Sequence, residues 1–367
     1  VGVSVSACRW EISMTDASEK RISSAPFVVV GASKSGTTWL QSIIDRHPDA
    51  VCSFERPVFP VDLSKMRYGL GKVATSSKRG FGGVFANAEE EQDYVDELRR
   101  IRSLEVLRHD YRDHHDIAED AYCEQARTLV RDILFKAASK EKFVVWGTKA
   151  YTHFEQLFRL YPDAKVIHIV RDGRDVAVSR RFHLFRMLTF FVGDEKSRLL
   201  SLLNRSAVGR CIARACRRVL GIWGREAYVD PKKGDPLFHH EVLKKMAFEW
   251  AEAVRLNRTV SVRNPTQYLE LKYEDMLVDL EGAIRRVCTF LEINSDPTLI
   301  TEIADKSRFG GMKKADHASS ESSFFRKGES GDWENYFSDA DKVLFKEIAG
   351  DLLVEMRYAA DHTWSSG

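Results

Sequence analysis

The sequence has few cysteines and no long apolar runs. Its six cysteines form no C-x-x-C pair and show no metal-ligand spacing, so we expect reduced thiols, a cytoplasmic location and no metal site. Apolar runs such as 166–170 and 187–192 are soon broken by charge, which excludes a membrane-spanning helix by length.

The chain also has no excess of charge of either sign. It carries 56 Lys and Arg against 54 Asp and Glu, a net charge of +2. Such a balance creates no global positive field, so we expect no nucleic-acid partner, and any basic site must be local. With 367 residues, 44% of them hydrophobic, the composition is that of a globular protein.

Residues 1–24 are polar and mixed, without the apolar core of a signal peptide. We expect them to form a disordered leader, with Met14 as a candidate original start. A single domain should then cover 25–358, with helical or loop insertions at about 57–140 and 183–236.

A strand, a tight loop and a helix are predicted from Phe27 to about Arg46. Residues 27–30 form a short apolar run, Gly31 and Gly36 enclose a four-residue loop, and an amphipathic stretch begins at Thr37. Such a loop exposes backbone N–H groups at the positive end of a helix, where an anion can replace the partners that the first turn lacks. A phosphate is the expected ligand.

The loop differs from a Walker A loop where the lysine is needed. The G-x-x-x-x-G spacing is present, but Thr37 occupies the lysine position, and Lys34 lies before the second glycine. A lysine inside the loop reaches different phosphate oxygens. An ATP-dependent phosphotransferase, with Asp172 as its metal ligand, is therefore only an alternative.

Strand and helix patterns alternate along the chain, which predicts an α/β fold. We expect three layers, with a central, mostly parallel sheet flanked by helices and a P-loop-like strand-loop-helix. Further strands are expected at 48–54, 143–149, 164–170 and 268–271, and helices at about 88–107, 117–139, 153–160, 243–257, 272–291 and 339–358.

Polar residues follow several of these strands, at the edge where open α/β sheets bind ligands. Glu55 follows the second strand and is a candidate base, although a surface pair with Arg56 would explain it equally well. Arg171 ends another strand, and Ser179 lies two helical turns on, so both could contact one phosphate.

Residues 33–40, S-K-S-G-T-T-W-L, resemble the 5′-phosphosulfate loop of the sulfotransferases that use 3′-phosphoadenosine 5′-phosphosulfate (PAPS), usually written P-K-S-G-T-T-W. Three further stretches resemble that family's signatures in the same order: R-D-G-R-D-V-A-V-S at 171–179, Y-E-D-M at 273–276 and R-K-G-E-S-G-D-W at 326–333. The chain departs from the pattern at Ala32-Ser33, where the Pro is missing, and at Glu334, where many members have Lys.

The resemblance implies PAPS as the donor, adenosine 3′,5′-bisphosphate as its product, and no metal. It implies that the first loop holds the 5′-phosphate, that the second and fourth stretches hold the 3′-phosphate, and that aromatic rings contact the adenine. The donor-binding residues expected from it are Ser33, Lys34, Ser35, Gly36, Thr37, Thr38, Trp39, Arg171, Ser179, Tyr273, Arg326, Lys327 and Gly328.

The resemblance also implies in-line transfer of a sulfuryl group to a hydroxyl or, less often, an amine. Lys34 would bind the bridging oxygen of the leaving group, and Lys149 would bind the sulfuryl oxygens. The family's base is a Glu soon after the first helix or a His just after the strand with the catalytic Lys. Glu55 matches the first pattern and is preferred; His153 matches the second loosely.

The acceptor is not covered by the resemblance. The apolar and aromatic insertions favour a small-molecule, lipid-like or natural-product acceptor. The Arg-rich stretch 199–222 predicts an amphipathic helix that either contacts an anionic membrane peripherally or forms a solvated face. A non-catalytic, nucleotide-binding member of the family is a further alternative, although Lys34 and both candidate bases are present. The sequence does not determine the oligomeric state.

Overall fold

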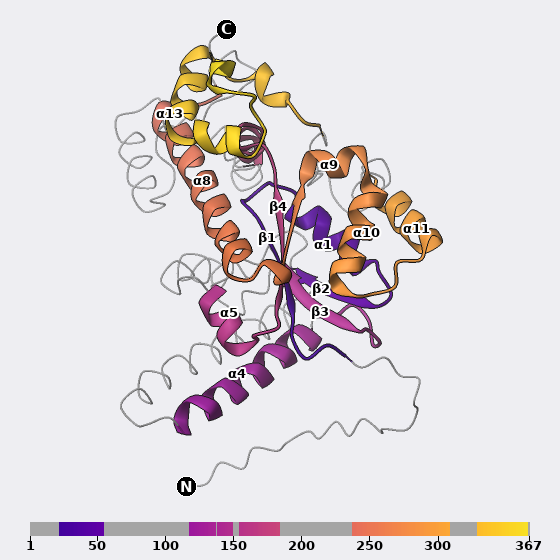
Figure 1. Ribbon diagram of the computed structural model, residues 1–367. Helices are drawn as coiled ribbons and strands as arrows, with labels where there is room; N and C mark the ends of the chain where they lie inside the picture. Colours follow the sequence, from indigo (N-terminus) through magenta and orange to yellow (C-terminus); the bar gives the residue numbers. More distant parts are fainter. Residues whose placement is uncertain are drawn as a thin grey trace, which may run out of the picture.

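The computed structural model describes residues 22–54, 117–136, 138–149, 154–183, 237–308 and 329–365. A five-stranded sheet lies at the centre of these residues, with strand order β2-β3-β1-β4-β5 and every neighbouring pair parallel (Figure 1). The predicted α/β fold with a parallel sheet is therefore confirmed. The strands are β1 (Phe27–Val30), β2 (Ala50–Phe54), β3 (Val145–Lys149), β4 (Lys165–Val170) and β5 (Tyr268–Lys272).

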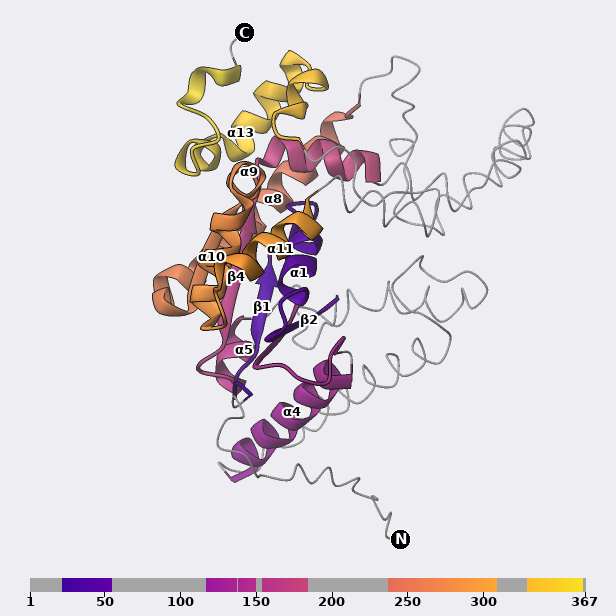
Figure 2. The same ribbon diagram turned by 90° about the vertical axis from the view of Figure 1, so that its right-hand side faces the viewer.

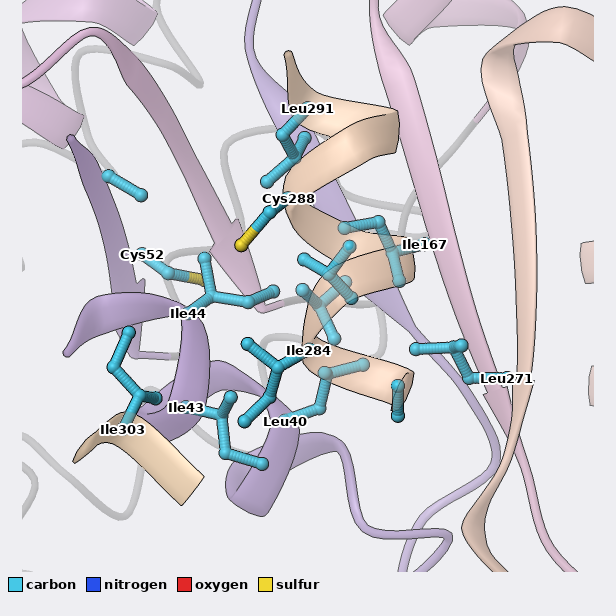
Figure 3. Packing of buried hydrophobic residues seen from close by; sticks show 14 of the residues in the cluster. Leu40, Ile43, Ile44, Cys52, Ile167, Leu271, Ile284, Cys288, Leu291 and Ile303 are labelled. Carbon is cyan, nitrogen blue, oxygen red and sulfur yellow. The ribbon is translucent and has the colours of Figure 1, made fainter. Parts of the chain in front are cut away.

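Helices cover one face of the sheet through side chains that alternate along each strand. Phe27 and Val29 belong to the core on this face, which also contains Leu40 and Ile284 (Figure 3). Successive side chains of a strand point to opposite faces, so a strand with helices on both faces is a continuous apolar run, as residues 27–30 are. The helices on this side are α1 (Thr37–Asp45), α9 (Tyr273–Val278), α10 (Leu280–Leu291) and α11 (Pro297–Ser307).

Val28 and Val30 point to the opposite face, where they join a second core with Trp146. Residues 173–183 are helical and, with α8 and α13, enclose a third core beyond the end of the strands. Both views place α13 and α4 at opposite ends of the sheet (Figures 1 and 2). These helices are α4 (Ile117–Lys136), α5 (Phe154–Leu160), α8 (His240–Arg263) and α13 (Asp339–Glu355), with short 3₁₀ turns at Pro265–Gln267, Asp332–Asn335 and His362–Ser365.

The path of the chain places a ligand site above β1. From β1 the chain runs through α1 to β2 on one side, whereas β4 pairs with β1 on the other side. Connections that leave a parallel sheet in opposite directions open a crevice at the carboxyl ends of the strands. The loop 31–36 lies at this switch point.

The C-terminal end of α1 is anchored by a lysine. The Nζ of Lys140 donates to the carbonyls of Asp45, His47 (3.0 Å) and Ala50 (2.6 Å). A cation at this end of a helix satisfies its last carbonyls and complements the helix dipole. This contact fixes α1 from the end opposite the loop.

The structure differs from the sequence-based expectation at two places, both among the helices. The helix expected over 272–291 is two helices, α9 and α10, separated at Asp279. Helix α11 was not expected. Ser23, within the expected leader, is hydrogen-bonded to Val144 and to the Trp146 indole.

A membrane span requires a length and an apolar composition that no helix in the described ranges combines. The expected helix at 88–107 and the stretch 199–222 lie outside the described residues.

Candidate functional site

The loop between β1 and α1 ends at Gly36, a position that only glycine can occupy without strain. Gly36 precedes α1 with a φ of 100°, and a Cβ there would lie 2.7 Å from the Tyr273 ring. As a glycine it supplies no side-chain cap for the first turn of α1. The amides of that turn are therefore suited to an anion, as expected from the sequence.

Lys34 adopts a backbone conformation that is unusual for a lysine. Its φ is 76°, in the left-handed region, which costs roughly 1–2 kcal/mol for a residue with a Cβ. Its carbonyl accepts a hydrogen bond from Nη1 of Arg171 at 3.4 Å. Residues held in this way by their surroundings occur preferentially at ligand-binding sites.

Strand pairing brings Lys149 to the same loop. Lys149 ends β3 opposite Val29 of β1, and its side chain is only 7% exposed. Its Nζ donates to Oγ1 of Thr38 at 2.9 Å. One of the predicted catalytic lysines thus contacts one of the predicted donor-binding residues.

Arg171 reaches the loop from the end of β4. It is 7% exposed, its guanidinium lies over the Tyr273 ring at 4.4 Å, and its Nη2 donates to the Glu329 carbonyl at 2.9 Å. These contacts place a buried positive charge beside the backbone of Lys34. A buried cation is stable only where anionic or hydrogen-bonding groups compensate for its lost hydration.

Two buried polar groups of the site have unused hydrogen-bonding capacity. Within the described part of the chain, neither Oγ of Ser35 nor Nε of Arg171 has a hydrogen-bond partner. Buried polar atoms are normally paired, and both of these groups can donate to a phosphate oxygen. The site therefore fits a ligand that carries phosphate groups.

The aromatic residues form the wall of the site. Trp39 is 2% exposed, and its ring meets Tyr273 edge-on with the centroids 5.5 Å apart. Its indole Nε1 donates to the Ser307 carbonyl at 2.8 Å. Burial raises the pKa of Tyr273, so its phenol stays neutral. Contact of these two rings with an adenine stays a prediction.

The remaining donor-site predictions have different outcomes. Ser33 is exposed, whereas Thr37 and Ser179 are half-buried, Ser179 on the helical segment 173–183. Their contacts with a phosphate stay predictions. Glu55, His153, Arg326, Lys327 and Gly328 lie outside the described residues.

A buried cluster around Arg174 was not predicted from the sequence. Its guanidinium pairs with Asp172 (Nη2 to Oδ2, 2.6 Å) and contacts the rings of Trp333 at 3.9 Å and Trp364 at 4.5 Å, which meet each other edge-on. It also donates to the Tyr358 carbonyl. Both oxygens of Asp172 accept from Arg174, which disfavours the metal-ligand role that a phosphotransferase would require.

Two further acids connect distant parts of the site. Asp175 accepts from the amides of Gly331 and Trp333, and Glu274 accepts from the Asp172 amide and the Tyr358 hydroxyl. Burial raises the pKa of both carboxyls, although Arg171 opposes the shift at Asp175. Their positions within the R-D-x-x-D and Y-E-D stretches were the available signal, but acidic residues are favourable in the first turn of any helix and so do not by themselves indicate a site.

Comparisons with known proteins agree with the motifs. Mouse Sulfotransferase 2A6 is 32% identical over 201 residues, covering 52% of this chain and 57% of the relative. Mouse Sulfotransferase 2A2 is 34% identical over 116 residues, 28% of this chain and 40% of the relative. The chain thus spans about half the length of the curated relatives it matches.

Among solved structures, mouse sulfotransferase SULT7A1 complexed with PAP aligns over 91% of this chain and 85% of that one, with 17% identity and a TM-score of 0.45. Residues 24–357, almost the whole chain, match the sulfotransferase domain family. The chain therefore belongs to the sulfotransferase domain family.

Proposed function

We propose that this chain transfers the sulfuryl group of PAPS to a hydroxyl group of a small-molecule acceptor. The proposal rests on one observation at the carboxyl edge of the sheet. Lys149 and Arg171 both contact the segment 34–38, where Gly36 leaves the first turn of α1 without a side-chain cap. The unused hydrogen-bonding groups of Ser35 and Arg171 support a phosphorylated ligand there.

The donor's 5′-phosphate would be held by the backbone amides of residues 35–38 and by the hydroxyls of Thr37 and Thr38. Its 3′-phosphate would be held by Arg171 and Ser179, with Arg326, Lys327 and Gly328. Trp39 and Tyr273 would contact the adenine.

The contact between Lys34 and Arg171 supports this assignment of two separate phosphate sites, because the Lys34 carbonyl joins the residues proposed for the 5′-phosphate to Arg171, proposed for the 3′-phosphate.

Transfer in line between two oxygens asks the protein mainly to position the reactants and to neutralise charge. Lys34 would stabilise the negative charge on the bridging oxygen of the departing nucleotide. Lys149, which is held beside Thr38, would bind the sulfuryl oxygens. The four cations Lys34, Arg171, Arg326 and Lys327 would supply the countercharge, without a metal.

A base must accept the proton of the acceptor. Glu55 is preferred to His153, and its pKa, ordinarily about 4.3, would have to rise in a closed pocket. Comparing Glu55→Gln with His153→Asn at saturating donor separates the two candidates. If a variant keeps the wild-type rate and pH profile, the residue that it replaces is not the base.

The acceptor class is a proposal that rests on composition. A hydroxyl of a lipid-like or natural-product molecule is preferred to an amine. Screening such acceptors with labelled PAPS tests the preference, and transfer to amines alone would overturn it.

Calorimetric titration tests the donor. We expect adenosine 3′,5′-bisphosphate to bind tightly without metal and ATP with magnesium to bind far more weakly, because two separate groups of cations would contact the two phosphates. Binding of ATP only with magnesium, and none of the bisphosphate, would contradict the proposal and favour a phosphotransferase.

A further inference from the structure

Asp175 is a buried carboxylate to which the proposed reaction gives no task. Its side chain is 1% exposed, and it accepts hydrogen bonds from the amides of Gly331 at 2.7 Å and Trp333 at 2.9 Å. These donors lie 156 and 158 residues further along the chain. Charge-assisted hydrogen bonds of this kind are stronger than neutral ones, so Asp175 fixes the turn 329–333.

The turn that Asp175 fixes reaches back to Arg171. Glu329, at its start, accepts a hydrogen bond from Nη2 of Arg171 at 2.9 Å, and Gly331 continues the turn with a φ of 82°. The ring of Tyr273 supports the same guanidinium at 4.4 Å. The guanidinium is therefore held by a ring and by a carbonyl whose position depends on Asp175.

Asp175 also positions the Trp333 ring, which contacts the neighbouring ion pair between Arg174 and Asp172. The Trp333 amide that it binds belongs to the residue whose ring lies 3.9 Å from the Arg174 guanidinium. Arg174 in turn pairs with Asp172, and the charge of Arg171 acts on the Asp175 carboxyl. One carboxylate thus connects the segment 171–175 to the turn 329–333.

We propose that Asp175 is a positioning residue that gives the site its selectivity for a nucleotide with a 3′-phosphate. It acts through the 329–333 turn, which orients the guanidinium of Arg171. The inference rests on the proposed function, in which Arg171 binds the 3′-phosphate of PAPS.

Asp175→Asn tests this assignment. Asparagine has the same size but offers one carbonyl oxygen and one NH₂ group, so one of the two backbone amides would face a donor. We expect affinity for adenosine 3′,5′-bisphosphate to fall by about tenfold to a hundredfold, as for groups displaced by a distant change. Affinity for adenosine 5′-monophosphate, which lacks the 3′-phosphate, should change much less. Calorimetric titration measures both.

The matched control is Asp341→Asn. Asp341 is also buried and also accepts from a backbone amide, that of Ser338, but it caps α13 and does not bind the 329–333 turn. We expect this variant to lose thermal stability while the ratio of the two affinities stays at the wild-type value. Thermal unfolding of both variants shows that each is folded, and Asp175→Ser replaces Asp175→Asn if the latter does not fold.

A double-mutant cycle with Arg171→Met tests the route of action. If Asp175 acts through Arg171, Asp175→Asn should not change the affinity ratio further in the Arg171→Met background. An additional loss of similar size there would overturn the assignment, as would an equal loss of affinity for both nucleotides in the single variant.

The result for the wild-type chain separates the two proposals. A wild-type chain that prefers the bisphosphate, together with an Asp175→Asn variant that keeps the full preference, would overturn the role of Asp175 alone. A wild-type chain that binds neither nucleotide, or both equally, would overturn the proposed function and this assignment with it.

Discussion

A lysine at position 34 adopts a backbone conformation that glycine would adopt at lower free energy. Its φ of 76° is left-handed, and its carbonyl is held by Arg171. Replacement by glycine would relieve the strain but remove the ammonium. A lysine in this strained conformation supports the proposed role of its charge in the loop.

Lys34→Ala should reduce turnover by roughly a hundredfold, because a charge that stabilises the leaving oxygen is lost at the transition state. Turnover with PAPS and an accepted acceptor, measured at saturating donor, checks this. Lys142, an exposed lysine on the segment before β3, provides the control, since Lys142→Ala should retain the wild-type rate. Near-normal turnover of Lys34→Ala would show that Lys34 does not stabilise the leaving group.

Most of the described residues that the sequence assigned to the site do meet there, because each follows a predicted strand whose end fixes its place. Lys149 and Arg171 are of this kind. What could not be predicted is which partner holds each group. Arg171 and Glu329 are 158 residues apart, and nothing local in either segment indicates the contact. Tyr273 was expected to meet an adenine, and its stacking under Arg171 was likewise unpredictable.

At the level of helices, Asp279 decides where one helix ends and the next begins. Its Oδ1 accepts from the Gly282 amide at 2.8 Å, which satisfies one of the free donors at the start of α10. Apolar residues recur at helical spacing throughout 273–291, so the break between α9 and α10 was not predicted. A capping aspartate with a glycine three residues on is a weaker signal than a Glu at that position would be.

Asp279→Ala should lower the free energy of unfolding by about 1 kcal/mol, since the amide loses its acceptor. Asp279→Asn, whose side-chain oxygen can still cap the helix, should change it by only a few tenths of that amount. Urea unfolding of both variants measures the difference. Equal losses would mean that the charge, rather than the hydrogen bond, stabilises this end of the helix.

Helix α11 was not predicted, although the sequence contains a signal for its start. Asp296 caps it, accepting from the amides of Thr298 and Leu299, and Pro297 takes its first position. An Asp-Pro pair before an apolar periodicity predicts a helix start. The strands, by contrast, were found within two residues, because short β-branched runs between turn residues allow few alternatives.

At the scale of the whole molecule, a polar cluster around the buried His168 joins the sheet to α8. His168 of β4 is fully buried, with Nδ1 2.6 Å from the Tyr268 hydroxyl, and that hydroxyl donates to Glu270 at 2.8 Å. Arg258 of α8 completes it, 3.3 Å from Glu270. Burial lowers the pKa of His168. At Glu270 burial acts to raise the pKa, but hydrogen bonds from His168 and Tyr268 outweigh it and the pKa is lowered.

The free energy of unfolding should fall as the pH falls below about 6.5, because the unfolded chain then binds a proton on His168 that the folded chain resists. Glu270 adds a second loss as the pH falls below 4.5, where its carboxylate begins to be protonated in the unfolded chain first. Urea unfolding between about pH 7.5 and pH 5 measures the first effect.

His168→Gln should flatten this pH dependence, because glutamine does not titrate. A wild-type slope in His168→Gln would assign the acid sensitivity to other groups.

The contact between Asp175 and the turn 329–333 also sets an order of events during synthesis. A ribosome adds about 5–20 residues per second. The loop 31–36 and Arg171 therefore emerge many seconds before Gly331 and Trp333, which follow Asp175 by 156 and 158 residues. Until that turn has been made, Arg171 of the nascent chain lacks the Glu329 carbonyl that holds its guanidinium. In the proposed function, the nucleotide would therefore bind the unfinished chain more weakly than the complete domain, and most of its stabilising effect is expected only after residues 329–333 have been made.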